Sequence, residues 1–161
     1  MKVRYAVLIA LAAAVTVASV ATASPQAVKQ RVQITSGGIA DPSSLTKFVL
    51  TPLSAGPLQP DSGTVGSVVA NQRTVTRDGQ TAQIVTWVST AKGKRGSFVV
   101  RVRIEHIDAG NGFHIGPGTW RFVRGTGAYA GMTGGGRVAN AFIDFGSRAL
   151  SERWDGFLTA P

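Results

Sequence analysis

Apolar and polar residues alternate along most of the chain after residue 30, and this two-residue period predicts β-strands. The alternation is clearest over Ser97–Asp108, where one face of the predicted strand is formed by Phe98, Val100, Val102, Ile104 and His106. The other face carries arginines and Glu105, as in a sheet with one dry and one wet side. No long stretch after position 23 shows the period of a helix. The pattern therefore predicts an all-β domain.

Turn signals divide the alternating stretches into eight or nine strands. Asp78-Gly79 is the strongest signal, because this pair favours a two-residue hairpin turn. Gly116-Pro117-Gly118 is expected to break the chain, and Thr126–Met132 to form at most one helical turn, with Thr126 as its N-cap. The predicted strands are Arg31–Thr35, Lys47–Leu53, Thr64–Ala70, Gln72–Arg77, Gln80–Thr90, Ser97–Asp108, Thr119–Arg124, Arg137–Asp144 and Arg148–Leu158.

Glycine is concentrated in Gly116–Gly136. A closed sheet needs residues without a Cβ where the chain turns a corner and passes close to its own backbone. A two-sheet sandwich is the alternative, but closure also removes exposed sheet edges, and the chain has no cysteine to brace a sandwich. The sequence therefore favours a closed antiparallel β-barrel.

The first 23 residues have the composition of a secretory signal peptide. Lys2 and Arg4 precede the apolar run Ala6–Val20, and Ala21-Thr22-Ala23 supplies small residues for cleavage. An uncleaved membrane anchor is the alternative, which the small residues and the following Ser-Pro pair disfavour. We therefore expect one domain over residues 24–161, either secreted or in the periplasm or cell envelope.

Composition narrows the chemistry. Cysteine is absent, which excludes disulfides, thiol nucleophiles and cysteine metal sites. The net charge is +9, and it falls to +7 when Lys2 and Arg4 leave with the signal peptide. This charge favours an anionic cell-surface polymer as a partner. The alternative, which stays open, is that the protein binds nothing specific through its charge. The basic loop Ala91–Gly96 lacks interleaved aromatic residues, so no specific nucleic acid is expected.

Three blocks of the chain resemble the allene oxide cyclase barrel superfamily, which includes dirigent proteins and small exported bacterial proteins. They are Phe48–Gly63, Gly118–Gly136, with its specific GTGAYAG run, and Trp154–Leu158. The resemblance implies an eight-stranded, calycin-like antiparallel barrel whose apolar lumen opens at one end. It also implies that the lumen holds a hydrophobic molecule, which some members cyclise or couple, and that the chain self-associates as some relatives do. The polar and cysteine lumen residues of the plant cyclases have no counterpart here, so no catalytic residue carries over.

Three polar residues are predicted on the inward face of the barrel wall. They are His106, Asn140 and Glu152. A carboxylate in a dry barrel costs several kcal/mol unless it is paired, and its pKa tends to rise. Glu152 is therefore the candidate general acid or base, with Asn140 or His106 orienting it. The alternative is that Glu152 pairs with an arginine or lies outside the barrel.

Aromatic side chains are predicted either to line a ligand cavity or to fill the barrel, because small eight-stranded barrels can do both. The candidate ligand-binding residues are Trp87, Trp120, Phe122, Phe142 and Trp154. The run Glu105–His114 gathers ligand-type side chains, but their spacing matches no strong metal signature, so they are interpreted as rim residues. No phosphate-binding loop or nucleophile elbow occurs, and no cofactor is expected.

Three functions follow from these patterns. The preferred hypothesis is an exported barrel that binds a small hydrophobic molecule in its lumen, with no catalysis assigned. The second is a cyclase or isomerase that confines its substrate in the lumen and uses Glu152. The third is a cell-envelope interaction protein that uses its basic surface.

Overall fold

The computed structural model describes residues 27–39, 45–110, 113–144 and 149–161, without the side chains of 109 and 140–144. The predicted signal peptide lies outside this part of the chain. The described residues form eight strands and one 3-10 turn. They are β1 (Lys29–Ile39), β2 (Thr46–Pro52), β3 (Asp61–Arg77), β4 (Gln80–Gly93), β5 (Ser97–Gly110), β6 (Phe113–Gly125), η1 (Gly127–Tyr129), β7 (Thr133–Asp144) and β8 (Ala149–Thr159).

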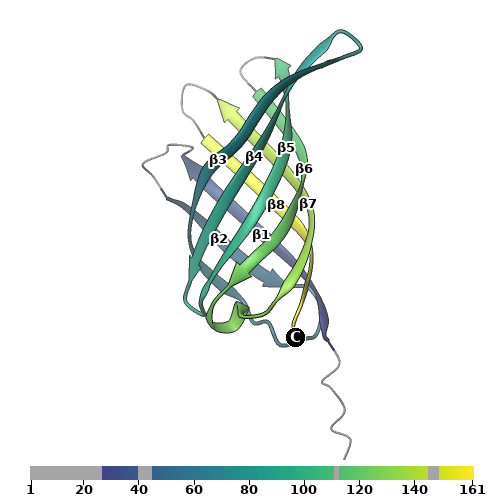
Figure 1. Ribbon diagram of the computed structural model, residues 1–161. Coiled ribbons are helices and arrows are strands. Elements are labelled where there is room, and N and C mark those ends of the chain that lie inside the picture. The colour runs from purple at the N-terminus through teal and green to yellow at the C-terminus, as the bar shows by residue number, and fades with distance from the viewer. Residues whose placement is uncertain (1–26, 40–44, 111–112, 145–148) are drawn as a thin grey trace, which may run out of the picture.

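All eight strands belong to one antiparallel sheet that closes into a ring, because β8 pairs with β1 (Figure 1). The all-β prediction is confirmed. A row of strand partners that starts at Ala82 of β4 returns to β4 at Lys92, ten residues further along. Such an offset requires strands inclined at roughly 35–45° to the barrel axis. The ring is called the barrel below.

The two ends of the barrel differ. The β3–β4 hairpin projects beyond the other strands at the top of Figure 1, and this end is called the upper end. Asp78 and Gly79 form the predicted hairpin turn with φ angles of 50° and 78°. The C-terminus and the turn between β6 and β7 lie at the opposite, lower end.

The lower half of the barrel is filled by aromatic side chains. The ring of Phe98 lies 5.5 Å from that of Phe48, 6.3 Å from that of Phe122 and 4.8 Å from that of Tyr129, measured between centroids. All four side chains are buried within one apolar cluster that includes residues from every strand. The cluster forms because alternate residues of each strand point inward.

Hydrogen bonds hold the loops of the lower end in place. The Asp61 carboxylate is buried and accepts bonds from Tyr129 Oη (2.8 Å) and from the backbone N–H groups of Ser62, Lys94 and Arg95. The side-chain amide of Gln30 binds the loop between β2 and β3. Its Nε2 donates to the backbone oxygens of Ser54 and Leu58, and its Oε1 accepts a bond from the Leu58 backbone N–H. These contacts cover the lower end.

Several predicted boundaries were wrong. The two strands expected around Asn71 form the single strand β3, in which a β-bulge between Val69 and Asn71 absorbs the irregularity. The segment Gly116-Pro117-Gly118 does not end a strand but lies within β6. Thr126 precedes η1, but its side chain bonds Ser97 instead of capping the turn.

The glycine segment allows the close approach that the sequence predicted. A Cβ added to Gly136 of β7 would overlap the carbonyl oxygen of Asp155 and the Cα of Gly156 in β8. Gly127 has a φ of 59°, and a Cβ there would overlap the carbonyl oxygen of Arg95. The backbone therefore passes itself at contact distance between β7 and β8 and around η1.

Candidate ligand site at the upper end of the barrel

The three predicted polar residues lie on strands at the upper end. His106 in β5 is opposite Gln83 of β4. Asn140 in β7 is opposite Glu152 of β8, and Glu152 is opposite Ser36 of β1 on its other side. The side chain of Asn140 lies outside the described residues. The catalytic roles of these residues stay predictions.

His106 and Glu152 occupy an intermediate environment, since both are half-buried. Burial lowers the pKa of His106, and repulsion from His114 lowers that pKa further. The neutral imidazole is therefore favoured, and it offers one donor and one acceptor nitrogen. His114 lies with its Nε2 3.9 Å from a carboxylate oxygen of Asp108.

Two tryptophans lie below the strand positions of His106, Asn140 and Glu152, towards the filled half of the barrel. The rings of Trp120 and Trp154 are 6.4 Å apart and tilted by 31°. Trp120 Nε1 donates to the backbone oxygen of Asp155 at 3.3 Å. Trp154 is only 2% exposed, and its Nε1 has no hydrogen-bond partner in the structure. Buried donors are nearly always paired, so this indole N–H requires an explanation.

The remaining predicted aromatic residues divide between the two halves. Trp87 is half-buried and lies next to Val102, which in turn is opposite Trp120. Phe122 packs against Phe98 in the filled lower half. Phe142 pairs through its backbone with Leu150, and its side chain lies outside the described residues.

Two pairs of hydroxyl groups connect neighbouring strands, one between β3 and β4 and one between β1 and β2. Ser67 Oγ and Ser89 Oγ are 2.8 Å apart, and Ser36 Oγ is 3.3 Å from Thr46 Oγ1. Ser36 and Ser89 are buried. These pairs were not predicted, although strict alternation places Ser36 inward with Val32 and Ile34. A serine at an inward position was the available signal.

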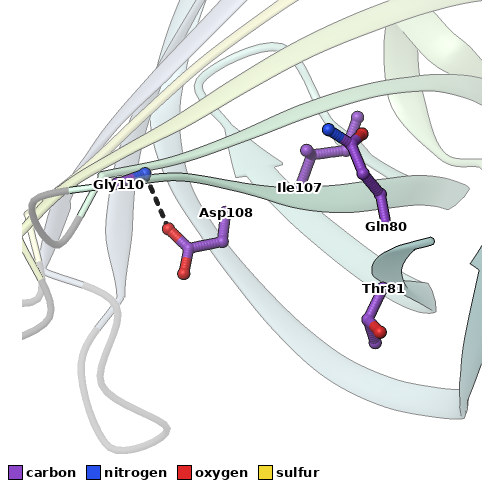
Figure 2. Close-up of a pocket in the computed structure, with 5 residues that line it drawn as sticks. All are labelled: Gln80, Thr81, Ile107, Asp108 and Gly110. Carbon is purple, nitrogen blue, oxygen red and sulfur yellow. Dashed lines mark hydrogen bonds between the residues drawn. The ribbon is translucent and has the colours of Figure 1, made fainter.

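Two surface pockets flank the barrel. One, of about 350 Å³, lies beside the β3–β4 hairpin and is lined by Gln80, Thr81, Ile107, Asp108 and Gly110 (Figure 2). In it, Asp108 accepts a 2.7 Å bond from the Gly110 backbone. The other, of about 570 Å³, is lined by Val49, Pro60, Asp61, Ser62, Lys94 and Arg95 at the lower end. Neither pocket includes a predicted ligand-binding residue.

Among the residues that the structure describes, no three His, Asp or Glu side chains come close enough to hold a metal ion. In the same part of the chain, no helix is long and apolar enough to cross a membrane. No protein-family model, no curated protein and no solved structure matches the chain. The fold and the site thus define a ring-like antiparallel sheet with a filled lower half and with His106 and Glu152 on strands at its upper end.

Proposed function

We propose that the protein binds a small, largely apolar molecule at the upper end of the barrel, with an oxygen of that molecule accepting a hydrogen bond from Trp154. The observation that carries the proposal is the buried, unpartnered Nε1–H of Trp154. A buried donor without a partner costs about 1–3 kcal/mol, and a bound acceptor removes this cost.

The surroundings of Trp154 fit such a molecule. Its strand partners Val138 and Ile34 are buried apolar residues, and Trp120 packs beside it. Towards the upper end, Glu152 follows on the same side of β8 and supplies a polar group. Ligand sites typically combine an apolar wall with a few polar groups that fix orientation.

We extend the proposal to the kind of barrel, its export and its domain organisation. The barrel would be of the calycin-like kind, exported after removal of residues 1–23, with residues 24–161 as its single domain. The resemblance to allene oxide cyclase and dirigent-like barrels supports a hydrophobic ligand. The enzymatic alternative is that Glu152 acts as a general acid or base on that ligand. It can be tested once the ligand has been identified.

The test begins with protein purified from its own host. Solvent extraction and mass spectrometry are expected to release one small apolar molecule. The emptied protein is then titrated with prodan, a neutral fluorophore with one carbonyl acceptor. We expect W154F to bind prodan about fivefold more weakly, the equivalent of one lost hydrogen bond, and to shift its emission to shorter wavelength.

W120F is the matched control, because the Trp120 N–H already bonds the Asp155 backbone. It removes an indole of the same size from the same level, and it should leave prodan emission unchanged. Circular dichroism confirms that both variants fold. Absence of any extracted molecule together with absence of prodan binding contradicts the proposal, as does equal binding by W154F and the wild type.

A further inference from the structure

Five arginines occupy neighbouring outward positions on three adjacent strands. Arg101 and Arg103 lie in β5, Arg121 and Arg124 in β6, and Arg137 in β7, and all five are exposed. Arg101 is directly opposite Arg121. Thr119 of β6 lies between Arg103 and Arg137. These residues are called the arginine face.

The arginine face works against the stability of the sheet. Directly opposed residues have Cβ atoms about 4.5–5.5 Å apart, and like charges at that distance are destabilising. Two acidic residues lie beside the face, since Glu105 follows Arg103 on the same side of β5 and Asp155 is opposite Arg137, but each forms its ion pair with another arginine. Glu105 pairs with Arg77 at 3.3 Å, across the intervening strand β4, and Asp155 pairs with Arg153 at 2.7 Å. None of the five arginines forms an ion pair with any residue that the structure describes.

We propose that the arginine face binds a linear polyanion that carries phosphate groups. Every cationic residue of the face is an arginine, and the planar guanidinium binds phosphate through two parallel hydrogen bonds. Alternate residues of a strand are about 7 Å apart and neighbouring strands about 4.8 Å, so the five groups form a compact lattice that successive phosphates of one chain can contact.

A polymer suits this face better than a membrane. The face lies on the outside wall of the barrel and extends along β6 to Arg124, one residue before that strand ends. Among the described residues of the face, Val123, between Arg121 and Arg124, is an exposed apolar residue, and the exposed Phe113 and Ile115 lie at the other end of β6. Membrane-surface binding generally needs a larger apolar contribution.

The test measures binding of inorganic polyphosphate by the full mature chain over a range of salt concentrations. We expect affinity to fall steeply with salt, because bound phosphates release counterions. R101Q/R121Q should weaken binding at least tenfold and reduce the slope of log K against log salt by about two. The same variant should unfold at an equal or higher temperature than the wild type, because it removes a like-charge pair.

K92Q/K94Q is the matched control, since it removes the same net charge from the end of β4 and the loop that follows it. It should bind polyphosphate nearly as tightly as the wild type. Equal losses in both variants would show that net charge alone acts and would overturn the proposal. Equal binding of polyglutamate would overturn the assignment to phosphate, and binding to anionic vesicles alone would overturn the choice of a polymer.

Polyanion binding at the arginine face is independent of ligand binding at the upper end. R101Q/R121Q is expected to bind prodan like the wild type, and W154F to bind polyphosphate like the wild type. Failure of one proposal therefore leaves the other measurable in the same set of proteins.

Discussion

At the scale of single residues, Asp61 combines burial with charge. It is 5% exposed, yet its carboxylate accepts bonds from Tyr129, Ser62, Lys94 and Arg95. Burial raises the pKa of Asp61, but the four hydrogen bonds outweigh it and hold that pKa below its usual value. Burial and the hydrogen bond to Asp61 raise the pKa of Tyr129. One carboxylate thus connects β3, the β4–β5 loop and η1.

Replacing this carboxylate should destabilise the lower end. We expect D61N to lower the free energy of unfolding by about 3 kcal/mol, because an amide cannot accept the same set of bonds and leaves buried donors unpaired. Y129F removes one of the four bonds and should cost about 1–2 kcal/mol. Urea unfolding followed by tryptophan fluorescence measures both. A free energy of unfolding for D61N within about 0.5 kcal/mol of the wild-type value would contradict this stabilising role of Asp61.

Asp61 also makes stability depend on pH. Because its folded pKa lies below its unfolded value, its contribution is fully present above the unfolded pKa and is lost as pH falls through the folded pKa. The Arg153 hydrogen bond lowers the pKa of Asp155, which adds a change of the same sign. Urea midpoints of the wild type should therefore fall below about pH 4, whereas those of D61N should fall less. Parallel profiles for the two proteins would exclude this role.

At the scale of elements, the contact between β7 and β8 depends on glycine. Gly134, Gly135 and Gly136 face β8 or β6 so closely that an added Cβ would overlap backbone atoms in each case. Backbone cannot move aside as a flexible side chain can. These glycines fix the distance between β7 and its neighbours, and through it the position of Trp154 on β8.

G136A should therefore destabilise the barrel by about 1–3 kcal/mol, the usual cost of overpacking. G37A is the matched control in β1, because its added Cβ would meet only the Leu150 carbonyl oxygen at 3.5 Å, an ordinary contact. We expect G37A to stay within about 0.5 kcal/mol of the wild type. Thermal and urea unfolding check both values, and equal stability of the two variants would refute the role of close packing at Gly136.

At the scale of the whole molecule, the positions of most strands along the chain followed from alternation and turn signals. The Asp78-Gly79 hairpin and the inward face of β5 were predictable because they depend on local backbone preference and on period-two patterning. The continuity of β3 was not, because a bulge keeps pairing where the pattern changes phase. The path through Gly116-Pro117-Gly118 was also missed, since pairing with β5 and β7 outweighs the weak local preference.

The candidate site was predictable only in part. Alternation assigned His106, Asn140 and Glu152 to inward positions, but it contained nothing about which strands bring them to the same end. The indole N–H of Trp120 has a hydrogen-bond partner and that of Trp154 has none, because the backbone oxygen of Asp155 lies within reach of Trp120 only. Asp61 lay outside the predicted strand Thr64–Ala70, although β3 begins at Asp61. Hydrogen-bond partners of this kind depend on three-dimensional positions that no local pattern encodes.

The most direct test of the ligand proposal is a ¹H–¹⁵N spectrum of the tryptophan indole N–H groups, recorded with and without prodan. The Trp154 signal is assigned by its absence in W154F. The account predicts that saturating prodan moves the Trp154 signal to higher proton frequency and changes it more than the Trp120 signal. A Trp154 indole signal that does not move at saturation would contradict the claim that this N–H binds the ligand.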